Sequence, residues 1–377
     1  MSPGGDPSAA APHAAGTLDP AAFARLLVGY CLEVEPGQQI LVRSTTLAAP
    51  LLLALQREIL ARDAWPLLRP ELPGQTREFY EHARERHLDG HPGLAFDEAR
   101  KADASLAIQA PENTRALAGI DPERIARAAI GRQPVRRQAL ERRWCLTVWP
   151  TEALAQEAGL ALADFTVLTR RALFLEQPDP VAAWGGLRAF QARLIERLEQ
   201  AGTIRIEADG TDITLDVKGR TWVNSDGRRN MPSGEVFTGP KEASANGTIR
   251  FDVPSSPAGV HVQGVELTFT DGEVTAARAE HGDAYLQRAL RTDDGARRLG
   301  ELGIGTNFGI DRRVGTILFD EKIGGTVHLA LGRSYPETGG RNESALHWDL
   351  ICDLRRGGRV TADGEVVQEN GRFVQLG

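Results

Sequence analysis

The feature that most limits how this chain can fold is the regular alternation of strand and helix patterns over its first 150 residues. Apolar runs typical of buried strands alternate with stretches whose apolar residues recur at helical spacing. The expected strands are 39–43, 65–68, 104–109 and 144–149, and the expected helices are 21–33, 47–62, 77–87 and 122–129. This alternation predicts a layered α/β domain with a largely parallel sheet.

A different pattern follows residue 150. Residues 151–198 are almost entirely helical in pattern, and Asp179-Pro180 is a typical helix start within them. From residue 202 onward most segments indicate strands, which are 204–208, 211–217, 248–253, 264–270 and 273–279, with a helix expected over 284–299. This change of pattern predicts an α+β region in the second half of the chain.

The chain is therefore expected to divide into three segments. A chain of 377 residues is longer than one ordinary hydrophobic core supports, so two domains are expected. The change of pattern places the domain boundary near residue 200. Residues 1–17 are rich in Pro, Gly, Ala and Ser and are predicted to form a disordered tail, because they cannot bury enough apolar area. Residues 18–200 are predicted to form the N-terminal α/β domain, and residues 201–377 the C-terminal α+β domain.

Composition narrows the functional classes. The residues are 41% hydrophobic and 25% charged, as in soluble globular proteins. A net charge of −7 does not supply the basic surface of a nucleic-acid binder, so no nucleic-acid partner is expected. No run approaches the roughly 20 apolar residues of a membrane span, and no secretory signal pattern is present, so no membrane partner is expected. Three scattered cysteines favour a reducing, cytoplasmic location.

The segment 345–354 predicts a strand with two contrasting faces. All side chains that would point to one face are apolar, which predicts that this face packs on the core. The other face presents His347, Asp349 and Asp353, with Ile351 as the one apolar exception. An imidazole beside a carboxylate on one strand face is a chelating pair for zinc, cobalt or manganese. The sequence therefore predicts a metal site on this strand.

Further side chains of suitable chemistry precede this strand. Glu235 lies in a proline- and glycine-rich stretch that predicts a stiff loop, and Glu301 is predicted to end a helix before a glycine-rich turn. Glu321 precedes a segment that carries His328, and Tyr335 ends that segment. Several carboxylates with two imidazoles are what two metal ions about 3.5–4 Å apart require. The residues alone favour a metal site and leave the reaction open.

At these positions taken together, the chain resembles the thermophilic metalloaminopeptidase family known as aminopeptidase T or aminopeptidase S. The resemblance extends from about residue 18 to the end of the chain. The motifs that carry it are Asp179-Pro-Val-Ala-Ala-Trp184, Gly234-Glu-Val-Phe-Thr-Gly-Pro240, Thr292-Asp-Asp-Gly-Ala-Arg-Arg-Leu-Gly-Glu301, Leu318-Phe-Asp-Glu321, Gly325-Thr-Val-His328 and Asn342-Glu-Ser344. The loop 336–341 is short where relatives often carry a longer insertion.

The resemblance implies that residues 201–377 form a catalytic metallopeptidase domain that releases N-terminal amino acids from short peptides. It also implies a homodimer with two divalent metal ions per subunit, either zinc, cobalt or manganese. The implied metal ligands are Glu235, Glu301, Glu321, His328, His347 and Asp349. As a hypothesis, Glu301 also carries a proton from the nucleophilic water to the leaving amine, and Tyr335 stabilises the oxyanion.

Two other interpretations remain open. A mononuclear iron dioxygenase on the same scaffold would open an aromatic ring with a His, His, Asp triad, and would not need Glu235 or Glu301 as ligands. A non-catalytic binding protein that has kept the motif would not hydrolyse aminoacyl p-nitroanilides. The presence of both glutamates favours the peptidase, and a metal content of about two ions per subunit instead of one iron would separate the two enzymes.

Overall fold

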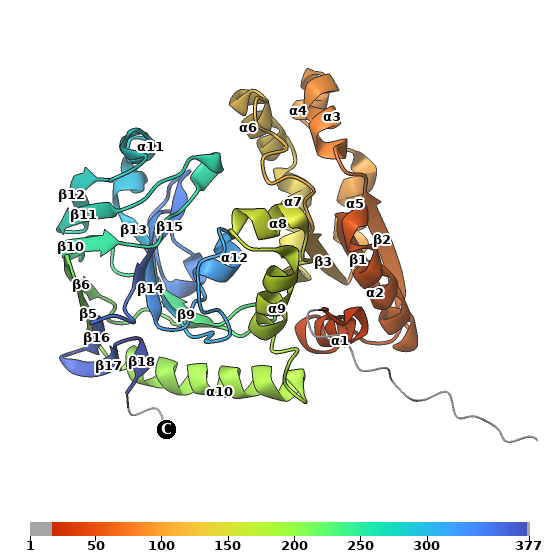
Figure 1. The fold of residues 1–377 in the computed structure, drawn as a ribbon. Helices are drawn as coiled ribbons and strands as arrows, with labels where there is room; N and C mark the ends of the chain where they lie inside the picture. Colours follow the sequence, from red (N-terminus) through yellow and green to blue (C-terminus); the bar gives the residue numbers. More distant parts are fainter. Residues whose placement is uncertain (1–16, 375–377) are drawn as a thin grey trace, which may run out of the picture.

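The chain folds into two lobes that lie side by side (Figure 1). The computed structural model describes residues 17–374. The tail predicted for residues 1–17 lies outside the described residues, apart from Thr17. Between residues 17 and 374, none of the helices combines the length and the apolar composition that crossing a lipid bilayer requires.

The first lobe is built on a five-stranded sheet in which every neighbouring pair of strands is parallel. In spatial order its strands are β2 (Trp65–Glu71), β1 (Gln39–Thr45), β3 (Ala104–Gln109), β4 (Arg143–Val148) and β8 (Asn230–Met231). The largely parallel sheet that the alternating pattern predicted is confirmed. Ile40 and Leu41 point to opposite faces of β1 and are both buried, because helices and loops cover both faces of the sheet.

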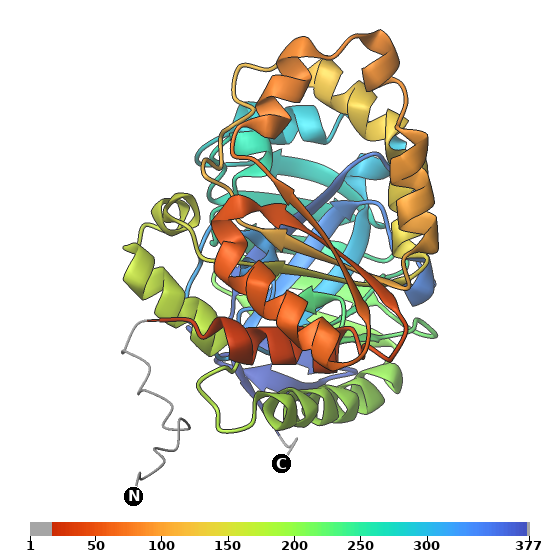
Figure 2. The same ribbon diagram turned by 90° about the vertical axis from the view of Figure 1, so that its right-hand side faces the viewer.

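Helices precede and connect these strands. They are α1 (Pro20–Leu26), α2 (Ala49–Ala61), α3 (Gln75–His82), α4 (Glu85–Leu88), α5 (Gly93–Lys101), α6 (Pro122–Gly131) and α7 (Gln133–Leu140). Figure 2 shows the red and orange helices α1 and α2 across the outer face of the first sheet, with the blue strands of the second lobe behind it. The single helix predicted over 77–87 is wrong, since Ala83 and Arg84 adopt extended backbone and divide it into α3 and α4.

The helix α10 (Pro180–Glu199) connects the cores of the two lobes along the lower edge of Figure 1. It begins as predicted, because the side chain of Asp179 accepts a hydrogen bond from the backbone N–H of Ala182 at 3.0 Å. Trp184 packs in the core of the first lobe, whereas Leu194 and Leu198 pack in the core of the second. The shorter helices α8 (Glu152–Glu157) and α9 (Leu162–Ala172) precede it.

The second lobe contains two antiparallel sheets that share one hydrophobic core. The strands of the eight-stranded sheet, in spatial order, are β12 (Glu273–Arg278), β11 (Val265–Thr270), β10 (Asn246–Phe251), β6 (Thr211–Asp216), β5 (Thr203–Ala208), β16 (Arg359–Ala362), β17 (Glu365–Glu369) and β18 (Arg372–Phe373). Those of the five-stranded sheet are β15 (His347–Asp353), β14 (Thr326–Gly332), β13 (Leu299–Gly305), β9 (Glu235–Thr238) and β7 (Val223–Ser225). The chain is thus a mixed α/β protein with one parallel and two antiparallel sheets.

Two sequence-based predictions about site residues are wrong at the level of local structure. The helix predicted over 284–299 is only α11 (Asp283–Ala289), so Glu301 lies inside the buried strand β13 instead of at a helix end. Beyond the helix, the carboxylate of Asp293 accepts a hydrogen bond from the hydroxyl of Ser344, a residue far along the chain. Glu235 was predicted in a loop and begins the strand β9.

Candidate metal centre

Neighbouring strands of the five-stranded sheet bring the candidate residues to one face of that sheet. The residues are Glu235 in β9, Glu301 in β13, His328 in β14, and His347 with Asp349 in β15. Leu302, Leu329 and Trp348 alternate with them and are buried in the core of the second lobe. Because side chains alternate across a strand, the apolar positions on one face fix the polar positions on the other.

Glu301 lies between the two imidazoles. Its Oε1 atom is 3.5 Å from Nε2 of His328, and its Oε2 atom is 3.5 Å from Nε2 of His347. Nε2 of His347 is also 3.6 Å from Oδ1 of Asp349. A carboxylate that faces a different nitrogen donor with each oxygen has the arrangement of a ligand shared by two metal ions.

A second group of charges lies on the other side of His328. Nζ of Lys322 is 2.8 Å from Oε1 of Glu235 and also pairs with Oε1 of Glu321. The remaining oxygen of Glu235, Oε2, is 3.5 Å from Nε2 of His328. Lys322 is fully buried, and the sequence analysis missed it because a run of charged residues is usually solvated.

The backbone orients the ring of His347. Its Nδ1 atom lies 2.8 Å from the carbonyl oxygen of Arg333, and a ring nitrogen must carry a proton to bond to a carbonyl. The lone pair of neutral His347 is therefore on Nε2, which faces Glu301 and Asp349. Metal-ligating histidines usually donate their second N–H to a carbonyl or carboxylate in this way.

Tyr335 lies beside the same imidazole. Its hydroxyl oxygen is 3.5 Å from Nε2 of His347, and its ring packs edge-on against the rings of His347 and Phe237. Burial, together with the charges of Glu301 and Asp349, raises the pKa of Tyr335 above its usual value. The phenol therefore keeps its proton and can donate a hydrogen bond.

The pKa values of the cluster reflect crowded, buried carboxylates. Burial, with a contribution from the charge of Glu321, raises the pKa of Glu235 to about 7 and that of Asp349 to about 6. Burial would lower the pKa of His328, but its hydrogen bond to Glu301 and the charge of Glu235 outweigh burial and raise this pKa to about 9. Several buried carboxylates this close together are costly to ionise, because their negative charges repel one another. A divalent cation bound between them would stabilise their ionised forms.

The donor atoms fit a metal ion by spacing and by chemistry. In the group Glu235, Glu321 and His328, and in the group Glu301, His328 and Asp349, the donor atoms all lie within 4.8 Å of one another. Oε2 of Glu235 and Oδ1 of Asp349 are buried without a hydrogen-bond partner. Buried polar atoms are costly unless paired, and carboxylate oxygens with imidazole nitrogens suit divalent ions such as zinc and manganese.

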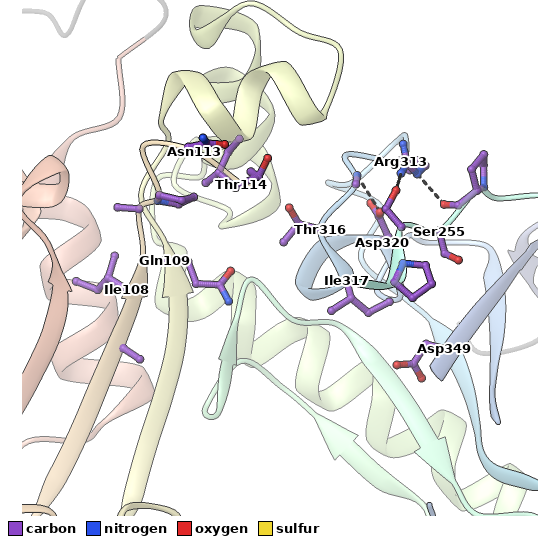
Figure 3. Close-up of a pocket in the computed structure, with 18 of the residues that line it drawn as sticks. Ile108, Gln109, Asn113, Thr114, Ser255, Arg313, Thr316, Ile317, Asp320 and Asp349 are labelled. Atoms are coloured by element: carbon purple, nitrogen blue, oxygen red, sulfur yellow. Dashed lines mark hydrogen bonds between the residues drawn. The ribbon is translucent and has the colours of Figure 1, made fainter. Parts of the chain in front are cut away.

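A cleft of about 800 Å³ between the two lobes reaches the cluster. His347 and Asp349 line it, so a molecule that enters the cleft meets the donor atoms. Figure 3 shows residues of the two lobes facing each other across the cleft, among them Gln109, Asn113 and Thr114 from the first lobe and Ser255, Arg313 and Asp320 from the second.

The predicted metal ligands and Tyr335 all lie in this cluster, which consists of Glu235, Glu301, Glu321, His328, Tyr335, His347 and Asp349. Asp353, on the same face of β15, instead pairs with Arg355. The sequence analysis missed Lys322 and the first-lobe side of the cleft. Gln109 ends β3, and Asn113 and Thr114 lie in the loop that follows this strand. Loops at the carboxyl ends of parallel strands commonly bind ligands, and this signal could have found them.

The chain is similar to known metalloproteases over most of its length. Residues 19–373 match the family described as thermophilic metalloprotease (M29). Aminopeptidase 2 of Geobacillus stearothermophilus is 33% identical over 394 residues, which cover 91% of this chain and 94% of that relative. Aminopeptidase T of Thermus thermophilus is 27% identical, with 87% of this chain and 91% of that relative covered.

The solved structure of wild-type AmpT from Thermus thermophilus matches with a TM-score of 0.81 at 25% identity, covering 94% of this chain and 99% of that one. The similarity thus includes both lobes and the strands that hold the carboxylates and imidazoles. The chain belongs to the M29 family of thermophilic metalloproteases.

Proposed function

We propose that this metalloprotease is an aminopeptidase that releases N-terminal amino acids from short peptides at a centre of two divalent metal ions. The ligands in this proposal are Glu235, Glu301, Glu321, His328, His347 and Asp349. The observation that carries it is the position of Glu301, whose two oxygens face the imidazoles of His328 and His347. His328 also belongs to a second ligand group, with Glu235 and Glu321. The relatives named aminopeptidase 2 and aminopeptidase T support the choice of an exopeptidase.

Glu301 is proposed to move the proton in the reaction. Divalent metal ions at such a centre supply a water-derived nucleophile near neutral pH and polarise the carbonyl of the scissile bond. The carboxylate of Glu301 accepts a proton from the attacking water and passes it to the nitrogen of the leaving amine. Glu301 is 4% exposed, which limits the access of bulk water to this proton.

Tyr335 is proposed to stabilise the charge that develops on the carbonyl oxygen. Its raised pKa keeps the phenol protonated, and its contacts with His347 and Phe237 hold the hydroxyl at the cluster. Donors in comparable oxyanion sites are worth about 3–4 kcal/mol of transition-state stabilisation.

The size of the cleft supports a short peptide as the substrate. Its volume of about 800 Å³ lies within the range of sites that take drug-sized ligands, which is the size of a short peptide. The peptide would lie between the lobes with its first residue at His347 and Asp349, which line the cleft.

The proposal includes the finer expectations from the sequence. Zinc, cobalt or manganese is the metal, two subunits form a homodimer, and the enzyme works in the cytoplasm. Cys31, Cys145 and Cys352 are free and buried, which supports a reducing compartment. We also retain a boundary near residue 200 between an N-terminal α/β domain and a C-terminal catalytic domain, with β8 as the one strand that returns to the first sheet.

Metal analysis combined with a substrate panel tests the proposal. The purified protein should contain about two divalent ions per subunit and should hydrolyse aminoacyl p-nitroanilides and short peptides from the N-terminus. A single iron per subunit would favour the ring-opening dioxygenase, which needs only two imidazoles and one carboxylate. Absence of hydrolysis with zinc, cobalt and manganese would favour a binding protein.

A further inference from the structure

Lys322 is a fully buried lysine whose ammonium group pairs with two candidate metal ligands. Its side chain is 0% exposed, and its ammonium group pairs with Glu235 at 2.8 Å and with Glu321. Lysine is almost never fully buried unless its charge is paired, because desolvating an ammonium ion costs several kcal/mol. The two carboxylates therefore stabilise the buried charge of Lys322, and the ammonium group in turn holds the two carboxylates.

The backbone fixes where this ammonium group lies. Lys322 follows the short helix α12 (Ile317–Asp320), and its N–H donates to the carbonyl of Phe319 at 2.9 Å. Its own carbonyl accepts a hydrogen bond from the N–H of Asn307 at 3.0 Å. The main chain is thus held on both sides, and the ammonium group is a rigid element of the cluster.

The two carboxylate oxygens of Glu235 contact different residues. Oε1 is held by Lys322, whereas Oε2 lies 3.5 Å from Nε2 of His328 and has no hydrogen-bond partner within residues 17–374. A ligand carboxylate that is bonded through one oxygen presents the other in a fixed direction, and such outer partners typically account for a 10- to 100-fold effect on metal affinity.

Lys322 acts on one half of the cluster only. Its ion pairs are with Glu235 and Glu321, which form a ligand group with His328. The group that contains Glu301 and Asp349 has no lysine contact among the described residues. The two halves therefore differ in charge, although they share one imidazole.

We propose that Lys322 is a positioning residue that aligns Glu235 and Glu321, so that the half of the centre formed with His328 binds its metal ion tightly. The half formed by Glu301, His347 and Asp349 does not depend on Lys322. This inference rests on the proposed two-metal function. It adds that only one of the two metal sites depends on Lys322 for its affinity.

The test is a metal titration of the full-length Lys322→Met protein, which keeps the length of the side chain and removes its charge. Metal-free protein is titrated with zinc against a chromophoric chelator. Wild type is expected to bind two ions, and Lys322→Met to bind one with unchanged affinity and the second about 10- to 100-fold more weakly. The matched control is Lys241→Met, because Lys241 pairs with Asp216 at 2.9 Å outside the cluster.

Two results would overturn the proposal. Unchanged affinity for both ions would show that Lys322 only fills space, and tighter binding of the second ion would show that the ammonium group competes with the metal. Circular dichroism and a thermal melt establish that the variant is folded. If Lys322→Met does not fold, Lys322→Gln takes its place, because its amide keeps a donor beside the carboxylates without the charge.

The same titration separates this inference from the proposed function. A wild-type protein that binds one ion contradicts the two-metal centre, whatever the variant does. In that case the dissociation constant of the single ion is compared between wild type and Lys322→Met. An unchanged dissociation constant rejects the role of Lys322 as well. A merely structural role would lower the melting temperature without selective loss of one of two ions.

Discussion

Gly303 and His328 face each other in adjacent strands of the five-stranded sheet, and the imidazole lies directly over the glycine. A Cβ atom at residue 303 would overlap the ring atoms Cε1 and Nε2 of His328. The absence of a side chain at residue 303 is therefore what allows this imidazole to lie so close to β13. Nε2 of His328 in turn faces both Glu235 and Glu301.

Gly303→Ala should displace His328 and weaken metal binding. Inserting a methyl group into packed structure typically costs about 1–3 kcal/mol. We expect a lower melting temperature and loss of at least one bound ion, measured by calorimetry and metal analysis. Gly186→Ala is the control, because a Cβ there meets nothing within 4 Å. Retention of both ions in Gly303→Ala would contradict the position of His328.

Glu301→Gln should lower kcat by about 10²- to 10⁴-fold, because the amide cannot accept and return a proton. The side chain keeps its shape, so the fold should survive, as measured by circular dichroism. Glu365 is exposed at the start of β17, and Glu365→Gln should behave as wild type. A near-normal kcat in Glu301→Gln would rule out its role in proton transfer.

Tyr335→Phe should lower kcat by about 10²- to 10³-fold with little change in KM, because the lost donor acts on charge present only in the transition state. The edge-on packing against His347 and Phe237 should be preserved by the phenylalanine ring. Steady-state kinetics on one aminoacyl p-nitroanilide measures both constants. A raised KM at constant kcat would instead assign Tyr335 to ground-state binding.

Asp293→Asn should destabilise the protein at neutral pH. Asp293 accepts hydrogen bonds from the hydroxyl of Ser344 and the N–H of Ala345, and the Ser344 bond is the main reason that the pKa of Asp293 is lowered. A lowered folded-state pKa contributes stability above the unfolded value of about 3.9, and this contribution is lost as the pH falls through the folded value.

The stability difference between wild type and Asp293→Asn should therefore be largest above about pH 5 and should shrink towards pH 3. Urea unfolding between pH 3 and pH 7 measures it. Asp209→Asn is the control, because the side chain of Asp209 is 99% exposed. A difference that stays constant with pH would mean that the carboxylate charge is not involved.

Removal of the metal ions should lower the melting temperature and abolish hydrolysis. A ligand present at 100 times its dissociation constant stabilises the folded state by about 2.7 kcal/mol. The buried carboxylates of Glu235 and Asp349, which lie among other negative charges, should lose this stabilisation in a chelator. Scanning calorimetry before and after readdition of metal measures the effect, and equal melting temperatures would count against a buried centre.

Local patterns were sufficient to predict much of the fold. The alternating apolar runs predicted the parallel first sheet, and the two faces of β15 predicted a buried Trp348 opposite His347. Long-range contacts account for the failures. The helix predicted over 284–299 ends at Ala289, and Asp293, within the predicted range, is held by bonds from Ser344 and Ala345.

One feature of the fold and one of the site had no local signal in the sequence. The strand β8 is only two residues long, so no alternation could indicate that it joins the first sheet. Lys322 follows Asp320 and Glu321, and a charged run of this kind normally faces solvent. Its burial depends on Glu235, a residue 87 positions earlier in the numbering of the chain.

The place of β8 in the first sheet affects how the protein is made. Strands β1 to β4 are complete once residue 148 has been synthesised, but β4 obtains its outer neighbour only when residues 230–231 have left the ribosome. During that interval the backbone groups of β4 on this edge have no strand partner. The nascent chain therefore cannot finish its first sheet before translation of the second lobe has begun.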